Sequence, residues 1–396
     1  MLSVFGKVSN KVYKGYKIRI YPTKDQIESL NKHIGHCRFI WNYMLETQIK
    51  RFENKEPRLK QFEMNKLITS LKKELPWLCE VSIHSLQNIC KDLDTAYDRL
   101  FKGTSKRPKF KSKRKAKLSF PVRSEKSTFY FKDGLVKIPV VGKLKYKADY
   151  PNLDLEKVAA FCNVRISYVN GKWILSFTIE YENQVLNENE KHGSLGIDLG
   201  VGRLAVVAYE GTKREYININ KTKVVRNLNR KLAHIQRILS RKYEAAKKTG
   251  KDPKEKSKQI LKYEALLKRI YHKLACIRLN QRHQIARELV NLHPERIVVE
   301  DLNVKGMMKN RHLAKAIGEM GFYDFVRILE YKCEELGIEL IKADRFYPSS
   351  KTCSHCGCIH IGLKLSDRTF ICPECGFVID RDYNAAIYFM YYSNSL

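Results

Sequence analysis

The spacing of apolar side chains changes along the first half of the chain. Residues 16–21 alternate between polar and apolar side chains and predict a strand. Thr23 and Gln26, three residues apart, have the spacing of a capping box and predict that a helix begins there. Residues 36–101 repeat apolar side chains at three- and four-residue intervals. This part of the chain therefore predicts one strand followed by a mostly helical region.

Short alternating runs follow the helical region and predict strands. The runs are residues 117–122, 128–131, 135–138, 164–169 and 173–180. Asn170 and Gly171 join the last two runs, and this dipeptide between alternating segments is a strong signal for a hairpin. Together with the first strand, these runs predict a small β-barrel or sheet that is interrupted by a helical insertion.

The second half of the chain has the element order of an α/β domain. The predicted elements are strands at 194–200, 203–209 and 215–219, a helical stretch at 221–292, a strand at 296–300, a helix at 314–336, a strand at 338–342 and a helix at 382–392. A break at 249–253 predicts that the long helical stretch is a hairpin. This is the order of an RNase H-like α/β domain, interrupted twice.

Three acidic residues lie where this pattern places the ends of elements. Asp198 follows an apolar run between glycines, Glu300 ends a β-branched strand, and Asp382 begins the last helix. A buried carboxylate is costly without a cation, and Mg²⁺ or Mn²⁺ prefers oxygen ligands. Two such ions promote in-line phosphodiester hydrolysis. Each acid alone also fits a turn or a helix cap, and spacing does not separate Glu300 from its neighbour Asp301.

The cysteines fall into two groups. Six of the eleven are scattered singly, which is typical of small packed side chains, and the other five crowd into residues 353–375. Two Cys-x-x-Cys pairs, each followed by glycine, have the spacing of a four-cysteine zinc ribbon. The predicted ligands of one structural zinc are Cys353, Cys356, Cys372 and Cys375. The spare potential ligands, which a closed tetrahedral shell does not need, are His355, Cys358 and His360.

Positive charge dominates the composition. The 75 Lys and Arg against 42 Asp and Glu give a net charge of +33. Self-repulsion on this scale favours a partner that supplies negative charge, and nucleic acid is the first candidate, although a solubility surface is the alternative. Residues 102–117 hold nine basic residues and no acid, and residues 221–290 carry a net +16. The side chains expected to contact phosphates are Lys109, Lys111, Lys113, Arg114 and Lys115.

The sequence also predicts a location in the cell. No run approaches about 20 apolar residues, and the N-terminal residues do not have the pattern of a signal peptide. The clustered cysteines favour a reducing compartment and a metal site over a disulfide framework. We therefore expect no membrane partner and a cytoplasmic, nucleoid-associated protein.

These motifs make the chain resemble TnpB, a family of transposon-encoded RNA-guided nucleases related to the compact type V CRISPR effectors. The resemblance covers nearly the whole length, in residues 16–23, 37–43, 107–113, 196–201, 299–304, 344–353 and 380–386. The last two segments are the most specific. One departure is 387–390, Ile-Tyr-Phe-Met, where the family commonly has Asn and an aliphatic residue.

The resemblance implies a domain order. The implied parts are a wedge-like β domain at 1–22 and 126–183, a helical recognition domain at 23–125, a linker at 184–192, a RuvC-like nuclease domain at 193–345, a zinc ribbon at 346–380 and a RuvC-like C-terminal segment at 381–396. Asp198, Glu300 and Asp382 would be the RuvC-type catalytic triad, which selects Glu300 over Asp301.

The resemblance also implies a function and partners. A monomeric protein in a prokaryotic cell would bind one guide RNA through its N-terminal domains. It would open double-stranded target DNA beside a short flanking motif and cut it in one active site. Three alternatives stay open: a nuclease acting on DNA without a guide, a guide-dependent DNA-binding repressor, and a transposase that joins DNA ends. The large basic N-terminal half favours a guide, and the three acids favour cutting over repression.

Overall fold

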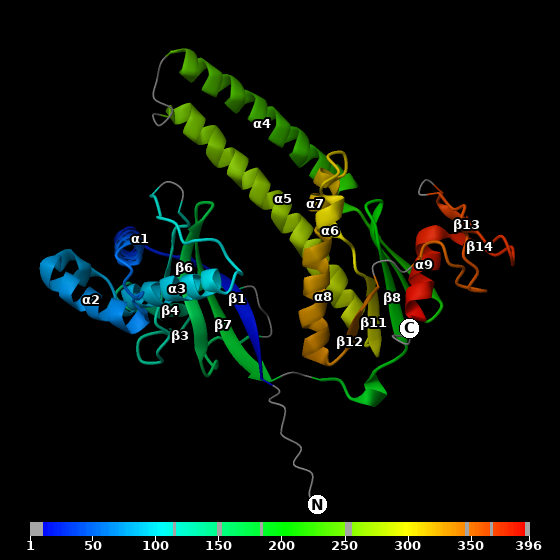
Figure 1. Cartoon of the computed structure of the whole chain (residues 1–396), viewed down its shortest axis with the longest axis horizontal. Helices are drawn as coiled ribbons and strands as arrows, with labels where there is room; N and C mark the ends of the chain where they lie inside the picture. The colour runs from blue at the N-terminus through cyan, green and yellow to red at the C-terminus, as the bar shows by residue number, and fades with distance from the viewer. Residues whose placement is uncertain are drawn as a thin grey trace, which may run out of the picture. The chain divides into compact units, whose positions relative to one another are not determined.

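A computed structural model of the chain describes residues 11–113, 116–148, 153–182, 185–249, 256–344, 348–364 and 367–392. The chain forms two compact units, Met1–Glu182 and Asn183–Leu396. Each unit is built around its own large sheet (Figure 1).

Unit 1 combines a curled antiparallel sheet with helices. Its helices are α1 (Lys24–Glu53), α2 (Gln61–Glu74) and α3 (Ile83–Phe101), with a short 3-10 helix at Pro76–Glu80. Its strands are β1 (Lys11–Tyr21), β2 (Ser119–Pro121), β3 (Tyr130–Lys132), β4 (Leu135–Ile138), β5 (Gly142–Lys147), β6 (Phe161–Val169) and β7 (Lys172–Glu182). The strand order in the sheet is β2-β6-β7-β1-β5-β4-β3.

The sheet of unit 1 curls onto itself, as the predicted barrel requires. Phe131 lies on the edge strand β3, and Phe161 lies on β6, five places away in the strand order. A flat sheet would separate them by about 24 Å, at roughly 4.8 Å per strand. Their ring centroids are 5.1 Å apart. Aromatic packing therefore closes the sheet around its core.

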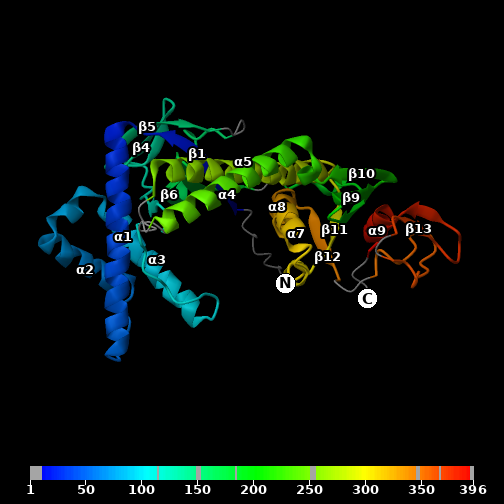
Figure 2. The ribbon, with the colours of Figure 1, turned by 90° about the horizontal axis from the view of Figure 1, so that it is seen from above.

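The helices of unit 1 form one apolar core with the curled sheet. Thr23 and Gln26 make the predicted capping box at the start of α1. The helix then continues to Glu53. A capping box marks where a helix begins but does not indicate where it ends. Figure 2 shows α1 as one long rod with α2 and α3 beside it. The ring of His33 on α1 stacks on Phe120 of β2 at 4.9 Å, which ties the helices to the sheet.

Unit 2 has the predicted α/β order. Its strands are β8 (Ser194–Leu199), β9 (Arg203–Tyr209), β10 (Thr212–Ile217), β11 (Arg296–Glu300), β12 (Glu339–Ala343), β13 (Thr369–Ile371) and β14 (Val378–Asp380). Its helices are α4 (Lys223–Lys248), α5 (Lys258–Val290), α6 (Val304–Met307), α7 (Ala314–Met320), α8 (Phe322–Leu336) and α9 (Arg381–Met390), with 3-10 turns at Glu188–Glu190 and Ile219–Lys221. The main sheet runs β10-β9-β8-β11-β12, and β13 pairs only with β14.

The main sheet of unit 2 lies between two helical layers. Strands β8, β9 and β10 pair antiparallel, while β11 is parallel to both β8 and β12. Leu195 and Ile197 of β8 join the core under α5, α7 and α8. The opposite face meets α9, and Figure 1 shows α8 and α9 on opposite sides of the sheet. This is the RNase H-like arrangement that the sequence predicts.

The long hairpin of α4 and α5 has its own apolar seam. Val225, Ile235 and Leu239 of α4 pack with Ile260 and Ile270 of α5. The chain between residues 250 and 255 lies outside the described residues, so the predicted break is seen only as the end of α4 and the start of α5. Although α5 has 33 residues, no helix in the described ranges is both long and apolar enough to cross a bilayer.

The single helix predicted over 314–336 is wrong, because the chain breaks at Gly321. This glycine has φ +67° and separates α7 from α8. A Cβ there would lie 2.6 Å from Nη1 of Arg282, which itself donates a hydrogen bond to the Met320 carbonyl oxygen at 3.0 Å. A side chain from α5 therefore packs against the break and binds the end of α7, a contact that no local pattern could show.

Gly321→Ala should destabilise unit 2, because alanine disfavours this φ and its Cβ would displace Arg282. We expect the free energy of unfolding to fall by roughly 1–3 kcal/mol. Gly318→Ala is the matched control, since Gly318 lies inside α7 with no atom nearer to a Cβ than 3.8 Å. It should stabilise by up to about 1 kcal/mol. Urea unfolding followed by circular dichroism measures both changes, and equal effects would contradict this explanation of the break.

Candidate active site and metal centre

Two of the predicted carboxylates lie on neighbouring strands. The parallel register of β8 and β11 pairs Ile197 with Val299. One step further along both strands, Asp198 lies beside Glu300. Neighbouring strands are about 4.8 Å apart, so the two side chains share one end of the sheet. Both residues are partly buried.

Helix α9 brings the third carboxylate to the same place. A Cβ at Gly196 would lie only 2.0 Å from the carbonyl oxygen of Ala386, so α9 rests directly on β8. Asp198 is two residues further along the strand and shares this face. Asp382 lies four residues, about 6 Å, before Ala386 along the helix. The negative charge of Asp382 contributes to raising the pKa of Asp198, in keeping with the place of α9 on this face of the sheet.

The electrostatics of this group favour a bound cation. Burial raises the pKa of Asp198 well above its ordinary value, and the negative charges of Glu300 and then Asp382 raise it further. Burial also raises the pKa of Glu300, with a contribution from Asp301. Crowded carboxylates of this kind hold their charge at neutral pH only if positive charge compensates them. The group therefore fits divalent ions with oxygen ligands.

The alternation of β11 separates Glu300 from Asp301. Val298 packs with Ala385 and Phe389 of α9. Glu300, two residues later, shares the face of Val298, whereas Asp301 follows the end of the strand. The charges that act on Asp198 include Glu300. Glu300 therefore lies on the face of β11 that meets α9.

Two arginines lie next to Asp382. Nη2 of Arg381 donates a hydrogen bond to Oδ1 of Asp382 at 3.1 Å. Nη1 of Arg368 lies 3.8 Å from Oδ2 of the same carboxylate. The side chain of Asp382 is 17% exposed, so this corner of the group opens toward solvent.

Sequence reasoning missed the residues that hold the start of α9. Asp380 caps the helix by accepting a hydrogen bond from the N–H of Tyr383 at 3.0 Å. Arg203 of β9 donates to both carboxylate oxygens of Asp380, at 3.3 and 3.0 Å. An acid just before a predicted helix is a capping signal that could have identified Asp380. Its partner on β9 could not be identified without the fold.

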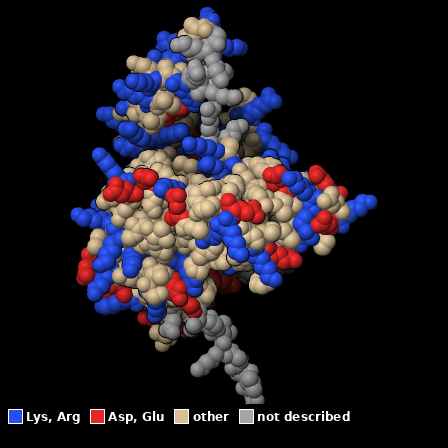
Figure 3. Space-filling view, turned by 90° about the vertical axis from the view of Figure 1, so that its left-hand side faces the viewer, with Lys and Arg blue, Asp and Glu red and all other residues tan. Residues whose placement is uncertain are grey.

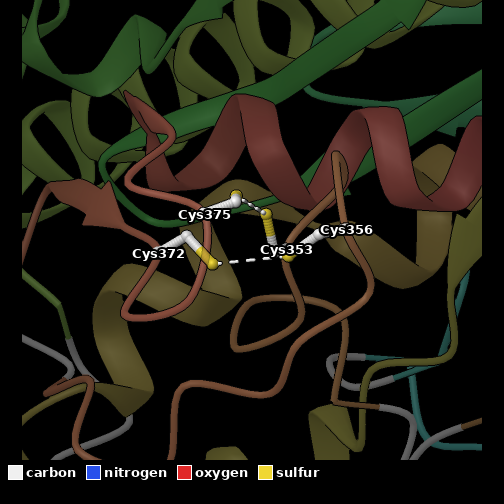
Figure 4. Close-up of side chains that lie close together, drawn as sticks. All are labelled: Cys353, Cys356, Cys372 and Cys375. Atoms are coloured by element: carbon white, nitrogen blue, oxygen red, sulfur yellow. Dashed lines mark hydrogen bonds between the residues drawn. The ribbon is translucent and has the colours of Figure 1, made fainter.

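The four predicted cysteines converge on one point (Figure 4). Their sulfur atoms all lie within 4.8 Å of one another. The Sγ atoms of Cys353 and Cys375 are 3.8 Å apart, and those of Cys356 and Cys372 are 3.5 Å apart. A tetrahedral zinc with Zn–S bonds of about 2.3 Å requires sulfurs about 3.8 Å apart. The four side chains can therefore hold a metal ion.

Two matching turns present these cysteines. After the first pair, the Cys353 N–H donates to the Cys358 carbonyl oxygen at 2.8 Å, and Gly357 has φ +75°. After the second pair, the Cys372 N–H donates to the Phe377 carbonyl oxygen at 2.9 Å. Backbone N–H groups of Cys375 and then Glu374 lower the pKa of Cys372 to about 6, which favours a thiolate. The spare histidines pack on aromatic rings, His355 on Phe377 and His360 on Phe370.

Within the basic strip of residues 102–117, the segment from Lys109 to Lys111 lies against α1. Asn42 exchanges two hydrogen bonds with the backbone of Lys111, at 3.0 and 2.7 Å. The Lys111 ammonium lies 3.4 Å from the centre of the Trp41 ring, and burial lowers its pKa to about 8. Lys109 and Lys113 are exposed. The other two predicted contacts, Arg114 and Lys115, lie outside the described residues.

A second basic surface, which the sequence patterns above do not predict, lies on the outward face of the curled sheet. This outer β face consists of Lys17, Arg19, Lys132, Lys137, Lys143, Lys145 and Lys147. Arg19 pairs with Lys147, and Lys137 pairs with Lys143, directly across neighbouring strands. Like charges opposite each other destabilise a sheet. An anionic partner would relieve this repulsion, and the lysines alternating along β5 are the signal that could have predicted the face.

The hairpin of α4 and α5 is the third basic surface. Its apolar seam is narrow, so most of its Lys and Arg side chains are exposed. Figure 3 shows Lys and Arg crowding over the end of the hairpin, in the upper part of the view. The basic strip, the outer β face and the α4–α5 hairpin are thus three surfaces with a net positive charge.

Three family models match parts of the chain. A model described as a helix-turn-helix domain matches residues 10–56, which form β1 and α1. A model described as a probable transposase matches residues 176–311. A model described as the Cas12f1-like TNB domain matches residues 322–389, which include the four cysteines and α9.

Related proteins share nearly the whole length of the chain. A protein from Streptomyces pristinaespiralis, named as an RNA-guided DNA endonuclease, is 30% identical over 380 residues, which cover 95% of this chain and 88% of the relative. The InsQ protein of Escherichia coli K12, named in the same way, is 26% identical and covers 95% and 91%.

The fold has a counterpart among solved structures. The Cas12f1 protein in a cryo-EM complex with sgRNA and target DNA matches with a TM-score of 0.60 and 14% identity, over 96% of this chain and 99% of that chain. This likeness concerns the fold, and the sequence relatives define the family. The chain therefore belongs to the TnpB family of RNA-guided DNA endonucleases.

Proposed function

We propose that this protein uses a guide RNA to find a DNA target and cuts it at Asp198, Glu300 and Asp382 with two divalent ions. The observation that carries the proposal is that Asp198 and Glu300 end neighbouring parallel strands, β8 and β11, while α9, which carries Asp382, rests on the same face of β8. Burial and the negative charges of Glu300 and Asp382 raise the pKa of Asp198. The family relationship supports the guide RNA and the DNA substrate.

The chain's own residues supply the ligands and their placement. Asp198 and Glu300 are held by parallel strands, and Asp382 is held at the start of α9. When bound, a pair of Mg²⁺ ions, or Mn²⁺, supplies an activated water and stabilises the leaving oxygen. The rigid sheet fixes two carboxylates, so the position of α9 decides whether the third completes the site.

Replacing any one of the three carboxylates by its amide should abolish cutting. We expect Asp198→Asn, Glu300→Gln and Asp382→Asn each to slow cleavage with Mg²⁺ more than about 100-fold, because loss of outer partners of metal ligands already costs 10- to 100-fold. Guide-RNA and target-DNA binding should be unchanged, since the basic surfaces are intact. Single-turnover cleavage and gel-shift assays measure the two effects.

Asp301→Asn is the matched control for the carboxylate variants. It removes the same charge one residue away from Glu300, yet it should keep cleavage within a few-fold of the wild type. Full cleavage in any of the three site variants would remove that residue from the site. If Asp301→Asn lost cleavage while Glu300→Gln kept it, Asp301 and not Glu300 would be the metal ligand.

The four-cysteine site should contain one zinc ion per chain. Cys353→Ser and Cys372→Ser should each lower the zinc content, whereas Cys358→Ser should not, because Cys358 lies outside the four converging thiols. Structural zinc contributes on the order of 10 kcal/mol to the folding of isolated zinc peptides, so the ribbon should unfold locally without it. Elemental analysis of freshly purified protein decides, and an absence of zinc would overturn the assignment.

The exposed basic surfaces are suited to the guide RNA. The outer β face and the exposed Lys109 and Lys113 of the strip offer lysines on the same unit. Lysine and arginine bind phosphates without reading the sequence, and base pairing of a guide then supplies specificity. Lys111 is poorly placed for this task because its ammonium lies over Trp41.

Neutralising the outer β face should weaken the salt dependence of RNA binding. The triple variant Lys132→Gln, Lys143→Gln and Lys145→Gln should flatten the slope of log affinity against log salt by about 2–3 if all three contact phosphates. The control is the triple variant Lys32→Gln, Lys50→Gln and Lys157→Gln, whose lysines pair with Glu80, Glu46 and Asp154. It removes the same charge but should barely change the slope. Equal slopes for both variants would exclude the outer β face from the RNA interface.

A further inference from the structure

Asn384, two residues after Asp382 on α9, is a fully buried polar side chain. Its Oδ1 accepts a hydrogen bond from the N–H of Ser354 at 2.9 Å. Its Nδ2 donates to the carbonyl oxygen of Thr352 at 2.6 Å. These backbone groups lie immediately before and after Cys353. One amide on α9 therefore holds the first cysteine turn of the ribbon from both sides.

The two sides of α9 have different partners. Successive residues of an α-helix are about 100° apart, so Asn384 lies about 200° around the helix from Asp382. Ala386 and Phe389 return to within about 40° of Asp382 and pack on the sheet. The helix thus faces the sheet with its metal-binding side and holds the ribbon with the opposite side.

The start of α9 is also continuous with the ribbon. Strand β14 ends at Asp380, and the helix begins at the next residue. The N–H of Arg381 donates to the Arg368 carbonyl oxygen at 2.9 Å, which adds a backbone link just before β13. Asp382 lies between this link and Asn384. Its position therefore depends on the ribbon as well as on the sheet.

We propose that Asn384 is a positioning residue that couples the four-cysteine site to Asp382, so that zinc in the ribbon tightens Mg²⁺ binding at the carboxylates. The proposal rests on the proposed function of the three acids. When the cysteine turn is ordered, Thr352 and Ser354 are held in place. Their hydrogen bonds to the Asn384 amide then fix the position of α9. The helix in turn holds Asp382 near Asp198. Such coupling is reciprocal, so Mg²⁺ binding also favours the ordered ribbon.

The test uses the full chain with its guide RNA and compares Asn384→Ala with Asn384→Leu, which keeps the side-chain volume. Both variants should retain one zinc per chain and bind RNA and target DNA normally. The half-saturating Mg²⁺ concentration should rise about 5- to 100-fold, the usual size of coupling between sites. Cleavage at saturating Mg²⁺ should recover most of the wild-type rate. A direct Mn²⁺ titration, monitored by electron paramagnetic resonance, should show a similar loss of metal affinity. This measurement does not depend on cleavage.

Ile328→Val is the control for a purely structural effect. It loosens the core on the other face of the sheet, under α8, and leaves α9 and the hydrogen bonds of Asn384 in place. It should lower the thermal midpoint while moving the half-saturating Mg²⁺ concentration less than about twofold. An equal shift in Ile328→Val and Asn384→Ala would overturn the proposal, and so would an unchanged Mg²⁺ requirement in Asn384→Leu.

The wild-type protein provides a second arm that does not depend on the folding of any variant. Zinc is removed with a chelator, the chelator is removed, and Mn²⁺ affinity is measured before and after zinc is restored. We expect the affinity to fall without zinc and to return with it, whereas an unchanged affinity would overturn the coupling. Full cleavage by Asp382→Asn would instead contradict the proposed function, so the two failures are distinguishable.

Discussion

The contact between α9 and Gly196 is the constraint on which the arrangement of Asp198, Glu300 and Asp382 depends. Any side chain at this position of β8 would collide with the backbone of the helix, since a Cβ would lie 2.0 Å from the Ala386 carbonyl oxygen. Glycine therefore allows α9 to rest directly on the strand. The same close approach brings Asp382 to the end of the sheet where Asp198 lies. Burial and the charges of Glu300 and Asp382 then raise the pKa of Asp198, and a bound divalent ion would stabilise its charged form.

The ribbon explains how a short C-terminal helix can be placed so accurately. Helix α9 has ten residues, too few to be stable through its own backbone hydrogen bonds. Its stability must come from its surroundings: the sheet on one side, the ribbon on the other, and Arg203 at the capping residue Asp380. The proposed zinc site, close to the helix, would thus support the proposed active site without touching the substrate.

Local patterns in the sequence predicted much of the fold. The capping box of α1, the β6–β7 hairpin and the order of elements in unit 2 follow from short-range spacing, and the structure confirms them. The break at Gly321 could not be predicted, because a single glycine is tolerated inside helices and Arg282, which packs against the break, belongs to another helix. Strand β5 was also missed, since its lysines hide the apolar alternation of Leu144 and Tyr146.

The candidate site was predictable to a similar extent. The spacing of the four cysteines is enough to predict a metal site. The three acids could be selected because they lie at the predicted ends of strands and a helix. Their approach depends on pairing between strands about a hundred residues apart, which no local pattern contains. The role of Lys111 could not be predicted, because a run of lysines does not indicate which of them lies over a tryptophan ring. The role of Asn384 could not be predicted either, because its hydrogen-bond partners lie 30 and 32 residues away in the sequence.

In the proposed function, β8, β11 and α9 build one site for two metal ions. Electron paramagnetic resonance of Mn²⁺ bound to the protein, with its guide RNA and a target that resists cleavage, tests this most directly. Two ions about 3.5–4 Å apart share ligands and should give a spin-coupled spectrum. We expect that coupled spectrum in the wild type and its loss in Asp382→Asn. A spectrum of isolated Mn²⁺ ions in the wild type, unchanged by Asp382→Asn, would contradict the account.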